Sequence, residues 1–400
     1  MTTELRGTER ANSKTTAPWS AYLEDLHSRV AHRFSRPEVR ERAYRYLSGL
    51  LADVRRKNSW QMAQAIGEAR PRGVQHLLND ARWDPDTVRN DLREYVVDHL
   101  ADERSGVLII DETGFLKKGE KSVGVAPQYT GTAGKRENAQ VGVFLCYASE
   151  KGVAFIDRAL YLPKEWADEP TRREEAGVPE EVRFATKGEL AKRLLKRAFE
   201  AGVPARWVVA DTVYGTARGL RGWLEKWGRC YVLAVPATQG VCHEGSQWQV
   251  RTVAKHLPEE AWFRASAGRG SKGERLYEWA CVALPDPVTT DAGRWLLMRR
   301  TIEEDPAELA YYLAYGPKET PVHELIRIAG RRWSVEDSFE AAKGEVGLDE
   351  YEVRKWDGWH RHITLCLLAH AFLVVMRSVA EQEEGAAKGG ISAQRISTPS

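Results

Sequence analysis

The stretch VLIIDETGF, residues 107–115, joins a run of four apolar residues to two adjacent acids. Four consecutive apolar residues rich in Ile and Val predict a buried strand. The acids that follow allow two interpretations. Asp, Thr and Gly are common in the turns that end strands. An acid at the mouth of a central strand is also held in place to bind a metal ion. The rest of the chain has to decide between these two.

Further apolar runs predict a mixed sheet around this first strand. Residues 140–149 and 153–162 predict two strands joined by a hairpin turn. A helix with a capping box then leads to a fourth buried strand at 206–211, and a fifth follows at 230–236. Because a helix connects them, the fourth strand is expected to lie parallel to the first.

Two acids come together in this arrangement. Asp111 emerges from the first strand and Asp211 from the fourth, so both are expected at the same end of the sheet. Two unrelated turns are a poor explanation for acids at equivalent ends of neighbouring strands. The two aspartates therefore form a candidate metal-binding pair.

The segment RRWSVEDSFEAAK, residues 331–343, offers a third acid. Arg332, Glu336, Glu340 and Lys343 fall along one face of a predicted helix. Taken alone, a solvated face with ion pairs inside the helix is the better explanation. Together with the strand-end acids, the helix favours a site of three carboxylates. Such hard oxygen ligands suit Mg²⁺, and chemistry with two metal ions requires carboxylates that the ions share.

Residues 21–104 carry apolar residues at spacings of three and four, which predicts an all-helical N-terminal domain. Within it, two short helices at about 58–80 resemble a helix-turn-helix, and a plain helical hairpin is the other interpretation. Arg70 and Arg72 lie at the start of the second helix, where such a motif would meet DNA.

Residues 237–316 contain Trp, Gly and three strand-like runs, namely QWQVRTVAK, YEWACVALP and RWLLMRRTI. These runs predict a β-rich insertion. The two ends of the chain, residues 1–20 and 381–400, are polar and are predicted to be disordered.

The net charge of +2 does not by itself indicate a nucleic-acid partner, so the placement of the charges matters. Lys117, Lys118 and Lys121 lie in the segment that follows Asp111, where they could follow a phosphate backbone. Ordinary solubility explains any single lysine equally well. Tyr129 lies in a Gly-rich polar segment that could also contact DNA.

The N-terminus has no apolar signal region, and the apolar segment 363–376 is too short to span a bilayer. We therefore expect no membrane association and a cytoplasmic protein. The five cysteines are scattered and odd in number, which disfavours a zinc site or a disulfide framework.

The chain resembles bacterial insertion-sequence transposases of the DDE type, in the branch with a β-rich insertion between the second Asp and the Glu. DETG, residues 111–114, resembles the first-acid motif, and VVADTVYG, residues 208–215, resembles the second. Residues 331–343 match the glutamate motif, with Arg and Glu four apart and a Lys seven further on. That motif normally begins with a Tyr, where this chain has Ala329.

The resemblance implies an α/β fold with an RNase H-like, mixed five-stranded sheet and flanking helices. It assigns this catalytic domain to residues 105–236 and 317–380, interrupted by the insertion. It also implies a bacterial protein that is associated with the nucleoid when it is bound to DNA.

The activity that the resemblance implies is cleavage of double-stranded DNA at transposon ends and joining of the 3′-OH ends to target DNA. Two Mg²⁺ ions, for which Mn²⁺ would substitute, would bind to Asp111, Asp211 and Glu336. Arg332 and Lys343 would neutralise phosphates beside the scissile bond. Since two DNA ends must be paired, a dimer on DNA is expected.

Three other functions fit part of the pattern. A nuclease on the same core would hydrolyse DNA without joining it. A catalytically inactive DNA-binding regulator would have lost one of the acids, but none is missing here. A glycosidase would explain a pair of carboxylates and not the two basic residues that flank the third.

Overall fold

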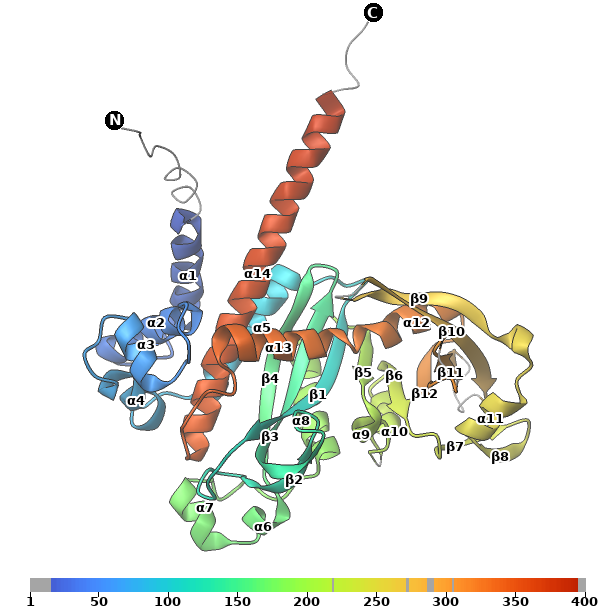
Figure 1. Cartoon of the computed structure of the whole chain (residues 1–400), viewed down its shortest axis with the longest axis horizontal. Coiled ribbons are helices and arrows are strands. Elements are labelled where there is room, and N and C mark those ends of the chain that lie inside the picture. Colours follow the sequence, from blue (N-terminus) through green and yellow to red (C-terminus); the bar gives the residue numbers. More distant parts are fainter. Residues whose placement is uncertain (1–15, 218, 271–272, 286–290, 304–305, 395–400) are drawn as a thin grey trace, which may run out of the picture.

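The computed structural model describes residues 16–217, 219–270, 273–285, 291–303 and 306–394. Within these residues a ten-stranded mixed sheet forms the centre of the molecule, with helices on both faces (Figure 1). Its strands are β1 (Val107–Leu116), β2 (Ala126–Thr130), β3 (Lys135–Ser149), β4 (Gly152–Tyr161), β5 (Trp207–Ala210), β6 (Cys230–Val235), β9 (Phe263–Gly270), β10 (Gly273–Leu284), β11 (Ala292–Arg300) and β12 (Leu309–Pro317). A separate hairpin consists of β7 (Gly240–His243) and β8 (Ser246–Gln249).

The five predicted strands are present as β1, β3, β4, β5 and β6. Strand β3 is antiparallel to β1 and to β4, while β1, β5 and β6 are parallel, as the sequence predicted. The prediction of a five-stranded sheet was wrong in its count. Strand β12 pairs antiparallel with β6, and the sheet continues through β11, β10 and β9. The strands of the predicted insertion therefore extend the central sheet.

Strand β1 does not end at the two acids. It continues to Leu116, paired with β3 throughout, whereas its pairing with β5 stops at Ile110 and Ala210. Gly114 is therefore a strand residue and not part of a turn. Only glycine fits at this position because the Thr130 side chain packs directly against the Gly114 backbone. A Cβ on Gly114 would lie 1.9 Å from the Thr130 hydroxyl oxygen.

The N-terminal part is all-helical, as predicted, and packs beside the sheet (Figure 1). Its helices are α1 (Thr16–Ala31), α2 (Pro37–Leu51), α3 (Ser59–Ala65), α4 (Arg72–Asn79) and α5 (Pro85–Leu100). Helix α1 begins at Thr16, within the segment 1–20 that was predicted to be disordered, and residues 1–15 lie outside the described part.

The remaining helices cover the sheet or connect its strands. They are α6 (Lys164–Ala167), α7 (Pro170–Ala176), α8 (Lys187–Glu200), α9 (Thr212–Gly215), α10 (Leu220–Lys226), α11 (Val250–His256), the 3₁₀ helix η1 (Glu259–Ala261), α12 (Val322–Arg331), α13 (Ser334–Val346) and α14 (Trp356–Gln394). The predicted capping box of α8 is present between Thr186 and Glu189. The run QWQVRTVAK, predicted as a strand, is mostly the helix α11.

Helix α14 is the long helix that crosses the sheet and projects beyond it (Figure 1). Its segment Trp356–Glu384 is long and apolar enough to span a membrane by length and composition, which is weak evidence. Its most apolar window is 72% buried inside the protein, as in the core helix of a globular domain. Helix α14 extends to Gln394, within the segment 381–400 that was predicted to be disordered, and residues 395–400 lie outside the described part. Ala, Glu, Gln and Lys favour helix even without an apolar stripe.

Candidate active site

The sheet brings Asp111 and Asp211 to neighbouring positions. The last parallel pair between β1 and β5 joins Ile110 to Ala210, so the two aspartates follow directly at the same level. Beyond this point β1 continues, while the chain after Asp211 turns into α9. The Asp211 carboxylate caps that helix by accepting a hydrogen bond of 3.0 Å from the Val213 N–H.

The two carboxylates disfavour each other's charge. Burial raises the pKa of Asp111 to about 7, and the neighbouring Asp211 charge adds to this, against a hydrogen bond from the Glu112 N–H and the charge of Arg332. Burial and the charge of Glu112 raise the pKa of Asp211. A pair of acids with raised pKa values in one place favours binding of a proton or a cation.

Arg332 connects this pair to the third acid. It lies where α12 ends and α13 begins, with its Nη1 atom 3.9 Å from Asp111 Oδ2. Its Nη2 atom donates a hydrogen bond of 2.7 Å to Glu336 Oε1. Glu336 is 56% exposed, and within the described residues no three His, Cys, Asp or Glu side chains are grouped to hold a metal ion.

Glu336 is thus near the aspartates but does not complete a site with them, and the predicted three-carboxylate cluster is not assembled. The physical reason is charge: without a cation, three carboxylates repel one another, and a guanidinium lies between them instead. Asp111 and Asp211 are placed together as expected, with Glu336 joined to them through Arg332.

Lys343, the last residue of the predicted motif, also points to this region. Its Nζ donates to the Thr113 hydroxyl at 2.8 Å and to the Thr132 hydroxyl at 3.3 Å. Thr113 lies two residues after Asp111 and therefore on the same face of β1. Both hydrogen-bond partners are uncharged hydroxyl groups. Burial lowers the pKa of Lys343 and the charge of Asp349 opposes this, so an anion next to the aspartates would favour the ammonium form.

A family model described as "DDE superfamily endonuclease" matches residues 29–258, which include both aspartates. The chain belongs to the DDE family of transposases and endonucleases. A second model, "Transposase DDE domain", matches residues 184–372, which include Asp211 and Glu336. The chain is 28% identical over 328 residues to a probable transposase for insertion sequence element IS701 from Microchaete diplosiphon. The match covers 79% of this chain and 78% of that protein.

The predicted first-acid motif contains two adjacent acids, Asp111 and Glu112, and the structure places their side chains apart. Glu112 points to the opposite face of β1 from Asp111. The Oε1 atom of Glu112 accepts a hydrogen bond of 2.7 Å from Lys187 Nζ. The buried Oε2 atom has no hydrogen-bond partner among the described residues. The buried Tyr214 phenol lies near it, and burial together with the Glu112 charge raises the pKa of Tyr214.

Sequence reasoning missed Lys187 and Tyr214 as neighbours of the site. Tyr214 had a signal, because it follows Asp211 by three residues, at the right distance to share one turn of helix. Lys187 had none: it lies on α8 and reaches Glu112 only in the folded chain.

The lysines after Asp111 do not behave alike. Lys117 was predicted to contact DNA, but its Nζ lies 3.5 Å from the centre of the Tyr351 ring and donates to the Tyr351 carbonyl at 3.0 Å. Burial lowers the pKa of Lys117 to about 8. Lys117 therefore has a packing role here, whereas Lys118 and Lys121 are exposed. Tyr129 on β2 is 64% exposed.

Arg70 and Arg72 are both exposed at the start of α4. Asn58 caps helix α3, which together with α4 forms the expected helical pair. The position of the motif's absent Tyr, Ala329, is buried on α12, so a side chain there faces the core in this chain.

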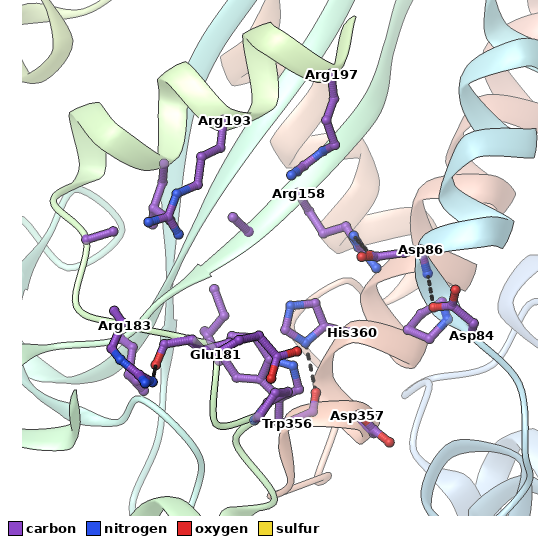
Figure 2. Close-up of a pocket in the computed structure, with 18 residues that line it drawn as sticks. Asp84, Asp86, Arg158, Glu181, Arg183, Arg193, Arg197, Trp356, Asp357 and His360 are labelled. Carbon is purple, nitrogen blue, oxygen red and sulfur yellow. Dashed lines mark hydrogen bonds and ion pairs between the residues drawn. The ribbon is translucent and has the colours of Figure 1, made fainter. Parts of the chain in front are cut away.

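A separate cavity of about 340 Å³ lies between α5, β4, α8 and the start of α14 (Figure 2). Its ionisable lining residues are Asp84, Asp86, Arg158, Glu181, Arg183, Arg193, Arg197, Asp357 and His360. Arg158 donates to Asp86 at 2.7 Å, and Arg197 donates to the neighbouring Asp157 at 2.8 Å. Acids and arginines balance, so we assign these contacts to holding α5 and α8 on the sheet.

Proposed function

We propose that this chain is a transposase that cuts double-stranded DNA at the ends of a mobile element and joins the 3′-OH ends to target DNA by metal-assisted phosphoryl transfer. The observation that carries the proposal is the adjacent pair Asp111 and Asp211, joined to Glu336 by Arg332. We propose it as a member of the branch whose β-rich insertion lies between the second Asp and the Glu.

The sheet supports an RNase H-like catalytic domain. Five strands in the order β4, β3, β1, β5, β6, with the first three antiparallel and the last three parallel, are what that fold requires. The domain comprises residues 105–236 and 317–380, and residues 237–316 form the insertion. Strands β9 to β12 support this division, since they lie at one end of the sheet (Figure 1).

The donor set fits Mg²⁺, with Mn²⁺ as a substitute. Asp111 and Asp211 would hold the metal, and Glu336 would join them after it leaves Arg332. When bound, two such ions would activate the attacking oxygen and stabilise the leaving oxygen at phosphorus. Arg332, freed from Glu336, and Lys343, whose described hydrogen-bond partners are hydroxyl groups, would neutralise the non-bridging phosphate oxygens.

Double-stranded DNA is the proposed partner, bound by a dimer that pairs two ends. The exposed Arg70, Arg72, Lys118, Lys121 and Tyr129 would contact its backbone. Such a protein would act in the bacterial cytoplasm, at the nucleoid.

The decisive experiment is a joining assay. The genomic DNA that flanks the coding sequence supplies the ends, prepared as duplexes with free 3′-OH groups and incubated with the protein, Mg²⁺ and a supercoiled target plasmid. We expect covalent joining of the 3′ ends to plasmid strands, read by sequencing the junctions. A parallel reaction uses the same ends still attached to their flanks, and cleavage there with no joined product in either reaction would identify a hydrolytic endonuclease instead. The absence of both cleaved and joined products would refute catalysis.

Mg²⁺ is expected to stabilise the folded protein, because it relieves the repulsion between Asp111 and Asp211. At a concentration about 100 times its Kd, a ligand that binds only the native state adds about 2.7 kcal/mol to the free energy of unfolding. Thermal unfolding in MgCl₂ and in NaCl of equal ionic strength measures this. Asp211→Asn should lose the specific Mg²⁺ shift. An equal shift in both salts would show that the aspartates hold no metal.

A further inference from the structure

Arg299, on β11, is a buried arginine that pairs with no acid among the described residues. It is 9% exposed, and its Nε atom is buried with no hydrogen-bond partner in the described part of the chain. The terminal nitrogens Nη1 and Nη2 of Arg299 likewise form no hydrogen bond or ion pair with a described residue. Unlike Nε, they are not fully buried and reach solvent. A buried guanidinium is usually retained only when something compensates its charge.

Two aromatic rings hold the Arg299 guanidinium. Its central carbon lies 4.4 Å from the centre of the Tyr277 ring and 5.1 Å from that of Trp333. The two rings stack on each other, with centroids 5.9 Å apart and planes at 23°. Such contacts fix the plane of a guanidinium but use none of its N–H donors.

The neighbouring Arg300 shows what a compensated arginine looks like on the same strand. It donates to Glu278 at 2.7 Å and to Glu259 at 2.5 Å. Both of these acids lie on the insertion, so the pairing is local. Arg299 lies instead against the rings of Tyr277 and Trp333, and no described acid pairs with it.

The cluster around Arg299 is next to the candidate active site. Trp333 directly follows Arg332, which contacts Asp111 and Glu336. Burial raises the pKa of Tyr312, while the charges of Arg299 and of Arg332 both act to lower it, so the two guanidinium groups lie near the same phenol.

The insertion is also packed tightly against this part of the chain. Strand β9 approaches α12 so closely that a Cβ on Gly330 would lie 1.9 Å from the Ala267 carbonyl oxygen. Arg275 of β10 lies over the Trp333 ring at 5.2 Å and 4.0 Å from Asp337. Arg299 is therefore fixed relative to the aspartates by close packing on two sides.

We propose that Arg299, packed against the stacked rings of Tyr277 and Trp333, binds a phosphate of the DNA backbone beside the scissile bond. The inference rests on the proposed function, because it requires DNA at the aspartates. Two parallel N–H donors of a guanidinium match two phosphate oxygens, and a phosphate would compensate a charge that no described acid pairs with. The contact would position the strand and would carry no sequence information.

The test compares Arg299→Met with the matched control Arg300→Met. Both variants lose one guanidinium from the same strand, but in Arg300 that guanidinium is already paired with acids. The probe is a fluorescent mixed-sequence duplex of about 40 base pairs, with binding followed by anisotropy between about 50 and 200 mM salt. Circular dichroism checks that each variant is folded.

For Arg299→Met we expect affinity to fall about tenfold, and the slope of log K against log salt to become shallower by about 0.9, the value of one lost phosphate contact. Arg300→Met should keep the wild-type slope. If the Met variant does not fold, Arg299→Gln, which keeps a polar head at the same place, is expected to show the same loss of slope.

Wild-type affinity and slope in a folded Arg299→Met or Arg299→Gln protein would overturn this inference and leave Arg299 a packing residue. Failure of the wild-type protein to bind the duplex in a salt-dependent manner would instead count against the proposed function. The two failures are therefore distinguishable.

Discussion

Asp111→Ala is expected to reduce cleavage and joining of DNA at least about 10³-fold, which corresponds to about 4 kcal/mol of lost transition-state stabilisation. The reason is its position: Asp111 is the acid that faces both Asp211 and Arg332 from β1. DNA binding should change by less than about twofold, because removal of an acid removes no phosphate contact. The fold should be retained, since the substitution relieves repulsion between buried carboxylates.

The measurement is the joining assay described above, combined with duplex binding and thermal unfolding of the same preparation. Asp337→Ala is the matched control, because Asp337 is an exposed acid on α13 next to Glu336. It should retain activity within about threefold, as expected for a surface substitution away from the chemistry. Full activity in Asp111→Ala would refute the assignment of the site.

Asp157→Asn is expected to destabilise the folded protein by about 3–5 kcal/mol, because it leaves buried arginines uncompensated. Asp157 is 1% exposed on β4. It accepts hydrogen bonds of 2.8 Å from Arg89 of α5 and 2.8 Å from Arg197 of α8, and Arg158 lies 3.9 Å away. Asn keeps the shape of the side chain, so the loss of stability measures the contribution of the carboxylate charge.

Urea unfolding at neutral pH measures this loss. Glu200→Gln is the control, because Glu200 forms an exposed ion pair with Lys196 at 3.5 Å on the same helix α8. Exposed pairs contribute roughly 0–1 kcal/mol. Equal effects of the two substitutions would show that the network around Asp157 is not what holds α5 and α8 on the sheet.

The ion pairs around Asp157 also predict that the stability of the folded protein depends on pH. Burial alone would raise the pKa of Asp157, but the charges of Arg197 and Arg89 and the hydrogen bond from Arg197 outweigh it and hold that pKa below its usual range. The folded-state pKa is thus below the unfolded one, so the stabilisation is complete above about pH 4 and is lost as the pH falls. Lowering the pH below about 4 should therefore reduce the difference in the free energy of unfolding between the wild-type protein and Asp157→Asn.

The central strands and the pair of aspartates could be predicted from the sequence because their signals are local. Apolar runs such as residues 107–110 and 207–210 fix buried strands, and a helix between strands fixes their parallel direction. Once those two strands are parallel neighbours, the residue after each has little freedom of position. Asp111 and Asp211 had to meet.

What could not be predicted depends on contacts between distant segments. Gly114 looks like a turn residue, and only the crossing of Thr130 explains why it lies within a strand. Lys117 looks like a free surface charge until Tyr351 is folded against it. The pairing of β12 with β6, which joins the insertion to the sheet, leaves no mark in either strand's own sequence.

That pairing has a mechanical consequence. Hydrogen-bonded strand pairing is continuous from β5 through β6 and β12 to β11. Arg299 on β11 and Asp211, which directly follows β5, are therefore connected through one sheet. DNA bound at β11 could not move independently of the carboxylates. Any tilt of the insertion would be transmitted through the paired strands to the position of the scissile bond. Alignment of the substrate would then be a property of the sheet itself, with no hinge needed between holding and cutting.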